Sequence, residues 1–419
     1  MMKSYRSAIL RFDADGQAVY ESDGLLVVGP DGAGRVVVQA VGPFAALQSR
    51  YPGVPMESLP GRIIAPGFID LHVHYPQVDV IGSPASGLLP WLENYTFPQE
   101  SRFADPAHAA HVAEFFLGEL LRNGVTTALT FATSHPASVD AFFTASAARG
   151  LRMISGKVLQ DRFSPDGVRD ETEQSLLDTD TLIGRWHGKG RLGYAITPRF
   201  APSCTDAQLR GAGELAARYP DVWIQSHVAE NRDEIAWAHE LFPTARSYLA
   251  VYDDAGLMRE RAIYAHCIHF DDEDRALMRA TGAAAAISPT SNLFLGSGFF
   301  DYAGADRIGF RYGLASDVGA GTSLSPFHTM KTLSRGIMTA TTLRWPWRSL
   351  TVLPGRRPRS VPSEDVTGKV LKARPSRSMR ARTWPMVSSA ETTAGSPIMP
   401  WIWFFTRRTS ATWSASPML

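Results

Sequence analysis

Residues 66–77 read PGFIDLHVHYPQ, an apolar, strand-like run that ends in two histidines. Alternate side chains of a strand share a face, so His72 and His74 are expected to point to one side and Val73 to the other. One histidine at a strand end is more often a hydrogen-bonded core or rim residue. Two imidazoles side by side suggest a metal site, and the rest of the chain decides between these interpretations.

Seven further apolar runs follow the first at regular intervals. Runs rich in Val, Ile, Leu and Ala are typical of buried parallel strands, and the segments between them have crossover length and helical periodicity, as in DAQLRGAGELAARY at 206–219. Eight such units predict an α/β fold, a (β/α)8 barrel of the TIM type. The eight candidate strands are APGFIDLH, GVTTALTF, RMISGKVL, RLGYAITP, VWIQSHVA, AIYAHCIHF, GAAAAISPT and RIGFRYGLASD.

The pattern differs on either side of the barrel, which we place at residues 66–340. Residues 1–65 alternate apolar and polar positions between turn signals, which predicts hairpins of a small β-sandwich domain. Residues 341–419 are crowded with Arg, Pro, Ser and Trp and contain few acids. This anomalous tail stands where a last helix and returning sandwich strands are expected. Its tryptophans argue against disorder, and we interpret its composition as that of GC-rich codons read in a shifted frame.

Composition limits the classes of function. The chain has 419 residues, 44% of them hydrophobic and 20% charged, and a formal charge of +1. These values describe a globular protein with no electrostatic preference for nucleic acid or for a membrane surface. The N-terminus lacks the apolar core of a signal peptide, so we expect a cytoplasmic location. Cys204 and Cys267 are far apart in the sequence, which predicts neither a disulfide framework nor a cysteine zinc site.

The predicted barrel provides a test of the metal-site interpretation of His72 and His74. Functional side chains of such barrels lie at the carboxyl ends of the strands, so further metal ligands are expected there. His227, His266 and Asp317 occupy three other predicted strand ends. Together with the pair they supply four imidazoles and one carboxylate, a set suited to zinc, with Fe²⁺ as the alternative. His269 is a rival ligand, but it lies beyond the expected end of its strand.

A bound divalent ion makes water acidic enough to attack at neutral pH, which predicts hydrolysis. Glu230, three residues after His227, is placed to pass a proton to the substrate, and Asp317 to take one from water. The alternative for Glu230 is a solvated loop acid or a first-turn helix charge.

The chain resembles the amidohydrolase superfamily over residues 5 to about 335, and within it the guanine deaminase branch. The resemblance rests on PGFIDLHVHYPQ, SHVAEN, HCIHF, SPTSNLFLGSG and SDVGAGTSLSP, with PWLENYTFPQE and TPRF favouring the guanine branch. It implies a zinc-dependent aminohydrolase of purine catabolism that converts guanine and water to xanthine and ammonia, with one metal per chain. It also implies a small-molecule purine partner and a homodimer, with no nucleic acid or membrane partner.

The resemblance also assigns roles to individual residues. His72, His74, His227 and Asp317 match the metal ligands. His266 matches an active-site histidine close to the metal, Glu230 the acid that protonates the purine, and Asp317 the group that activates water. Gln77, Arg199 and Phe200 match the substrate contacts. An amide and a guanidinium can address the lactam edge of a purine while a phenyl ring stacks on its face.

Other interpretations stay open at this point. A sister hydrolase of the same scaffold would act on 8-oxoguanine, another aminopurine, a triazine or a pyrimidine. Lys157 raises a binuclear variant bridged by a carbamylated lysine. A metal-free scaffold, or a nucleic-acid-binding protein that uses the basic tail, would be of another class. The HxE and PCxxC pattern of cytidine-type zinc deaminases is absent from the sequence.

Overall fold

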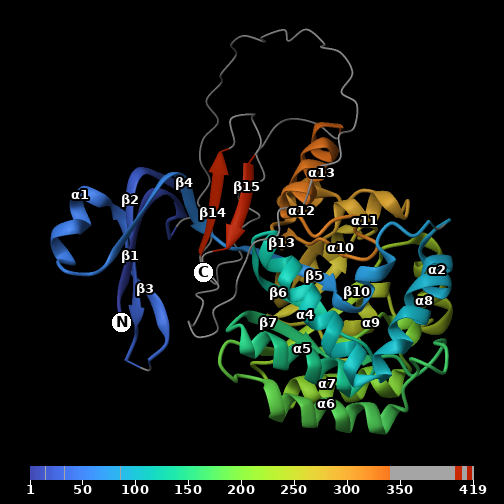
Figure 1. Ribbon diagram of the computed structural model, residues 1–419. Coiled ribbons are helices and arrows are strands. Elements are labelled where there is room, and N and C mark those ends of the chain that lie inside the picture. The colour runs from blue at the N-terminus through green and yellow to red at the C-terminus, as the bar shows by residue number, and fades with distance from the viewer. Residues whose placement is uncertain (15, 33, 85, 340–401, 408–412, 418–419) are drawn as a thin grey trace. The chain divides into compact units, whose positions relative to one another are not determined.

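The computed structural model describes residues 1–419 except 15, 33, 85, 340–401, 408–412 and 418–419 (Figure 1). Four strands of the N-terminal segment belong to a mixed sheet of six strands in the order β15-β14-β4-β1-β2-β3. Strands β1 to β3 are antiparallel neighbours, as the hairpin pattern predicts, and β4 lies parallel to β1. The strands are β1 (Lys3–Phe12), β2 (Ala18–Pro30), β3 (Val36–Pro43) and β4 (Met56–Pro66).

Two strands of this sheet come from the segment that was predicted to be an anomalous tail. Strand β14 (Ile402–Arg407) pairs antiparallel with β4, and β15 (Trp413–Pro417) pairs antiparallel with β14. Most of residues 341–419 lies outside the described residues. The frame-shift interpretation, the nucleic-acid role of the tail and the boundaries of the three predicted domains therefore stay predictions.

The predicted barrel is confirmed. All eight predicted strands form, and each pairs in parallel with its neighbours around a nearly closed ring. The third predicted run contains a short additional strand, β8 (Val158–Leu159), which pairs with β9. The other strands are β5 (Phe68–His74), β6 (Val125–Phe131), β7 (Arg152–Gly156), β9 (Gly193–Pro198), β10 (Trp223–Val228), β11 (Ala262–His266), β12 (Ala284–Ile287) and β13 (Arg311–Leu314).

The ring closes between the first and last strands at their carboxyl ends. The backbone N–H of Asp317 donates to the carbonyl of His72 at 2.9 Å, and the N–H of His74 donates to the carbonyl of Val318 at 2.8 Å. A cluster of side chains from strands around the ring meets through the interior and fills it, as in other barrels of this kind. Its members are Leu71, Leu129, Ile154, Ala195, Ile263, Ala284, Ala286 and Ala315.

Helices follow the strands and cover the outside of the ring (Figure 1). Several begin at side chains that accept a backbone N–H, among them Asp105, Thr205 and Asp271, which reduces the number of unsatisfied donors at the helix start. No helix in the described part of the chain is both long and apolar enough to cross a bilayer. The helices are α4 (Pro106–Arg122), α5 (Pro136–Ala148), α6 (Thr172–Trp186), α7 (Asp206–Arg218), α8 (Arg232–Leu241), α9 (Tyr248–Asp254), α10 (Asp272–Thr281), α11 (Pro289–Phe294), α12 (Tyr302–Ile308) and α13 (Pro326–Thr339).

The segment between β5 and α4 is longer than the connections from the other barrel strands to the helices that follow them, and it has helical structure of its own. It contains the short turns η2 (Tyr75–Val80) and η4 (Arg102–Ala104), the helices α2 (Leu88–Trp91) and α3 (Phe97–Ser101), and a π-helical turn at 92–96. We call residues 75–104 the β5–α4 insert. It starts directly after His74 at the carboxyl end of β5, where loops of this fold build active sites.

Candidate metal centre and pocket

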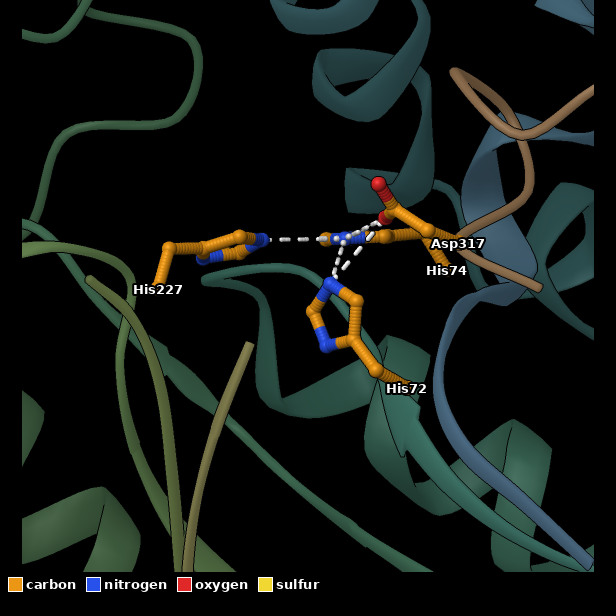
Figure 2. Close-up of side chains that lie close together, drawn as sticks. All are labelled: His72, His74, His227 and Asp317. Atoms are coloured by element: carbon orange, nitrogen blue, oxygen red, sulfur yellow. Dashed lines mark hydrogen bonds and ion pairs between the residues drawn. The ribbon is translucent and has the colours of Figure 1, made fainter. Parts of the chain in front are cut away.

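Four predicted metal ligands lie together at the carboxyl ends of the strands. The ligand atoms of His72, His74, His227 and Asp317 all lie within 4.8 Å of one another. Figure 2 shows the imidazole of His227 approaching the other three side chains from the opposite side. His72 and His74 point to the same side of β5, as strand alternation predicts, although the pairing of β5 with β6 is irregular between Asp70 and Val73.

The nitrogens of this cluster face one another at short distances. Nε2 of His74 lies 3.1 Å from Nε2 of His72 and 3.2 Å from Nε2 of His227. Oδ1 of Asp317 lies 3.0 Å from Nε2 of His72 and 3.4 Å from Nε2 of His74. Three imidazole nitrogens and one carboxylate oxygen therefore converge on one point.

The charge states of the cluster suit a cation. Burial is the main cause that lowers the pKa of His74 to about 4 and holds the pKa of His227 well below its ordinary value. Burial acts to raise the pKa of Asp317, but the neighbouring imidazoles outweigh it and keep that pKa well below its usual range. Neutral imidazoles and an ionised carboxylate are the forms that bind metal ions.

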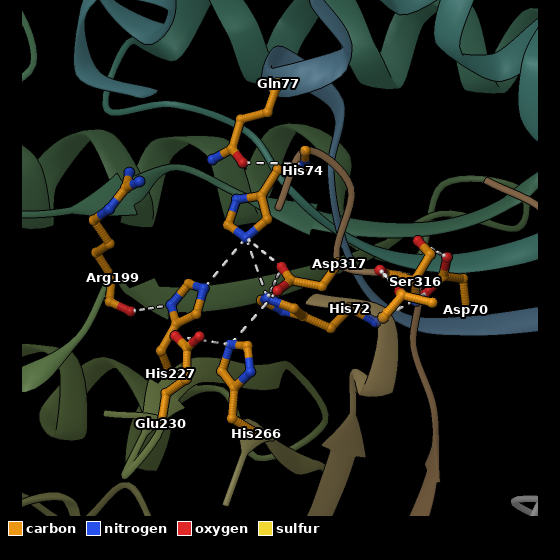
Figure 3. Close-up of polar contacts among 12 residues, drawn as sticks. Asp70, His72, His74, Gln77, Arg199, His227, Glu230, His266, Ser316 and Asp317 are labelled. Carbon is orange, nitrogen blue, oxygen red and sulfur yellow. Dashed lines mark hydrogen bonds and ion pairs between the residues drawn. The ribbon is translucent and has the colours of Figure 1, made fainter. Parts of the chain in front are cut away.

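Hydrogen bonds outside the cluster orient its members. Nδ1 of His227 lies 2.6 Å from the backbone carbonyl of Arg199, which can only accept, so the proton is on Nδ1 and the lone pair of Nε2 faces the cluster. The buried carboxylate of Asp70 accepts from the backbone N–H of His72 at 3.2 Å and of Ser316 at 3.0 Å, and thereby joins the β5 ligands to the turn that carries Asp317 (Figure 3). This donor set fits a metal such as zinc or iron, since both ions bind imidazole nitrogens and carboxylate oxygens.

Glu230 lies beside the cluster, three residues after β10 reaches His227. It is buried, and its Oε1 accepts a hydrogen bond of 2.9 Å from the hydroxyl of Ser297. Burial, with a smaller contribution from Asp317, raises the pKa of Glu230 to about 8, so the carboxyl is protonated at neutral pH. A second buried acid, Glu234, accepts from the backbone N–H groups of Glu230 and Asn231 and holds this turn in place.

His266 lies between the acid and the cluster. Its Nε2 is 3.4 Å from Oε2 of Glu230 and 3.7 Å from Oδ2 of Asp317, while its Nδ1 faces Oδ1 of Asn292 at 2.9 Å. His266 and Asp317 both have positive φ angles, 72° and 52°, which is costly for residues with a Cβ. Such strained backbone is typical of functional sites, where surrounding contacts hold it in place.

The cluster opens into a pocket at the carboxyl ends of the strands. Gln77, Arg199 and Phe200, the three predicted substrate contacts, line it together with Glu230 and His266. Apolar walls come from the β5–α4 insert and from the segment after β12, so the pocket combines apolar walls with a few polar groups, as is typical of small-molecule sites. The remaining lining residues are His74, Leu88, Trp91, Leu92, His227, Glu234, Leu295, Asp317 and Ala320.

His269 and Lys157, the two alternative site residues, lie outside the donor cluster. The Nε2 of His269 faces the backbone carbonyl of Ser297 at 3.1 Å, and His269 is not part of the donor cluster. Lys157 is buried, and its ammonium pairs with Asp170 at 2.7 Å. That contact occupies the amine that a carbamylated bridge would use, so the single-metal arrangement is favoured.

Sequence reasoning missed several residues of the site. Asp70 could have been found from its place in the IDLHVH strand, two residues before His72. Glu234 is the third residue of α8 in a capping box with Asn231, a local signal that the sequence does carry. Glu100 has no comparable signal, although it contacts both Gln77 and Arg199.

Comparisons with known proteins agree with this geometry. Residues 63–345 match the Amidohydrolase family. The chain is 39% identical over 329 residues to the probable guanine deaminase of Deinococcus radiodurans, which covers 77% of this chain and 75% of that protein. It is 45% identical over 270 residues to the guanine deaminase of Escherichia coli, covering 64% of this chain but only 62% of that protein.

Comparison with a solved structure also indicates a relationship to guanine deaminases. The structure of guanine deaminase from C. acetobutylicum with bound guanine in the active site matches with a TM-score of 0.78 and 29% identity, over 84% of each chain. The chain therefore belongs to the amidohydrolase family, in its guanine deaminase group.

Proposed function

We propose that this protein hydrolyses guanine to xanthine and ammonia with a single bound zinc ion. The observation that carries the proposal is that one pocket brings together the donor cluster, the protonated acid Glu230 and the three side chains Gln77, Arg199 and Phe200. The relative from C. acetobutylicum, whose structure contains guanine in its active site, supports the choice of substrate.

In this proposal His72, His74, His227 and Asp317 would hold the ion. The ion supplies the Lewis acidity that lets water attack at neutral pH. Oδ1 of Asp317 faces His72, so its Oδ2, 3.7 Å from His266, is the oxygen free to accept a proton from water. Zinc is the specific choice because three imidazoles and a carboxylate are typical of its sites.

Glu230 supplies the other proton. Its carboxyl donates to the ring nitrogen next to the carbon that bears the amino group, which makes that carbon more electrophilic. A C–O bond then forms, and the proton that Asp317 takes from water passes to the amino nitrogen. The C–N bond breaks, ammonia departs, and the proton of the new hydroxyl group returns to Glu230 as the carbonyl of xanthine forms. A carboxyl with a pKa of about 8 is suited to this role, because it is protonated at neutral pH yet can give its proton away.

The other side chains bind and orient the purine. Phe200 is buried, and its ring lies edge to face with that of Trp237, with 6.1 Å between the ring centres. A stacked purine would place its polar edge toward the amide of Gln77 and the guanidinium of Arg199, which Figure 3 shows on the same side of the donor cluster. The cytoplasmic location and the homodimer stay predictions from the sequence.

The test uses the purified full-length protein of 419 residues. Metal content by mass spectrometry should give about one zinc per chain, and ammonia release should occur with guanine but not with adenine or cytosine. Metal without guanine turnover would instead favour a sister hydrolase, which 8-oxoguanine, triazine and pyrimidine substrates would then identify. A folded protein with neither metal nor turnover would overturn the proposal.

A further inference from the structure

Glu100 contacts both of the polar side chains to which purine recognition was assigned. It lies in α3 of the β5–α4 insert and is fully buried. Its Oε1 accepts from Nε2 of Gln77 at 2.8 Å and from Nη2 of Arg199 at 3.2 Å, and its Oε2 accepts from Nη1 of Arg199 at 2.6 Å. One carboxylate therefore joins two side chains that come from different strand ends.

This contact fixes the orientation of the Gln77 amide. An ionised carboxylate can only accept, so the amide nitrogen faces Glu100. On the other side, the backbone N–H of Gly319 donates to Oε1 of Gln77 at 3.2 Å. A Cβ at position 319 would come within 2.5 Å of the backbone oxygen of Gln77, so glycine is needed for this approach. The amide keeps one N–H and one lone pair for a ligand.

The same contact cancels the charge of Arg199. The side chains of Arg199 and Glu100 are 3% and 0% exposed, so water screens neither of them. The ring of Phe97, one turn before Glu100 on α3, lies 5.0 Å from the guanidinium carbon and closes its other side. Arg199 still offers N–H donors to a purine, but as half of a neutral pair.

The other charged groups of the pocket point to a neutral ligand as well. Glu230, Glu234 and Asp317 are acids, and Arg199 is the only lysine or arginine among the residues that line the pocket. At the end of the pocket formed by Gln77 and Arg199, away from the metal ligands, a purine anion would therefore meet no uncompensated cation, while a neutral lactam would lose little on burial if its polar atoms are paired.

We propose that Glu100 is a positioning residue that holds Gln77 and Arg199 in place and makes the pocket select neutral purines over purine anions. The inference rests on the proposed guanine deaminase activity and adds a selectivity to it. Glu100→Gln would leave Arg199 with an uncompensated charge and would place an amide N–H against either Gln77 or Arg199.

The experiment compares wild type, Glu100→Gln and Glu100→Asp at pH 7, with Glu93→Gln as a matched control, because Glu93 is an exposed acid of the same insert. The readouts are KM and kcat for guanine, inhibition by urate, which is a purine anion at this pH, and metal content. We expect Glu100→Gln to raise the guanine KM about tenfold or more and to strengthen urate inhibition by a similar factor, with metal retained. Glu93→Gln should match wild type.

Glu100→Asp keeps the charge but shortens the side chain, so it should raise the guanine KM without strengthening urate inhibition. This variant also keeps the proposal testable if Glu100→Gln does not fold. Equal weakening of guanine and urate binding in Glu100→Gln would overturn the selectivity, and unchanged kinetics would overturn the positioning role. Should wild type not turn over guanine, the proposed function fails separately, and calorimetric binding of guanine and urate to the same variants still tests Glu100.

Discussion

The backbone carbonyl of Arg199 accepts a hydrogen bond from Nδ1 of His227 at 2.6 Å, while the side chain of Arg199 forms the ion pair with Glu100. One residue thus orients a predicted metal ligand with its main chain and contributes to the proposed purine end of the pocket with its side chain. The two functions are separable, because substitution of the side chain leaves the carbonyl in place. The variants below are likewise chosen so that each changes one function of the site.

Glu230→Gln should keep the metal and lose turnover. The amide has nearly the shape of the carboxyl but cannot give up a proton with a suitable pKa, so we expect kcat to fall by about 10²- to 10⁴-fold. Steady-state kinetics and metal analysis of the same preparation measure both effects. Glu240→Gln, at an exposed position of α8, is the matched control and should match wild type. Full activity in Glu230→Gln would refute the role of this acid.

His227→Ala should lose both metal and activity, because it removes one of the four converging donors. His269→Ala should retain the metal, since that imidazole lies outside the cluster. Chelation of the wild-type protein should abolish turnover, and added zinc should restore it in wild type and in His269→Ala alone. A His227→Ala protein that binds one zinc with wild-type affinity would show that the ligand set is wrong.

Activity should decline at high pH as Glu230 loses its proton. Its pKa is raised to about 8, so the donating form predominates at pH 7, and kcat should fall as the pH rises through about 8. Ser297→Ala removes a hydrogen bond that lowers this pKa. The descending limb of the kcat profile should therefore move to higher pH in Ser297→Ala, by about half a unit to one unit. A shift to lower pH would contradict the assignment of this limb to Glu230.

Lys157 should matter for stability and not for metal binding. Lys157→Met leaves the buried carboxylate of Asp170 without its cation, and breaking such a pair costs about 3–5 kcal/mol of unfolding free energy. The double variant Lys157→Met/Asp170→Asn should recover part of this loss, because no unpaired charge is then buried. Denaturant unfolding measures the change. Loss of bound metal from a folded Lys157→Met protein would instead revive the bridging-lysine alternative.

The barrel and the convergence of His72, His74, His227 and Asp317 could be predicted from the sequence because both depend on local pattern. Eight apolar runs and the histidines at their ends can be read one strand at a time, and all eight strands are found. The residues that the sequence did not reveal act across the fold. Glu100 lies 99 positions before Arg199, and Ser297 lies 67 positions after Glu230. Nothing in the local sequence distinguishes such a buried acid or hydroxyl from a solvated one.

The site draws its two halves from different kinds of chain segment. The predicted metal ligands lie on barrel strands or directly after one, whereas Gln77 and Glu100 belong to the β5–α4 insert, and Arg199 and Phe200 lie in the shorter connection after β9. In evolutionary terms the reactive half is constrained by folding, while the selective half can change within one excursion of about thirty residues. Grafting an insert from a sister hydrolase, with matching changes at 199 and 200, is therefore a direct route to a new substrate on an unchanged metal centre.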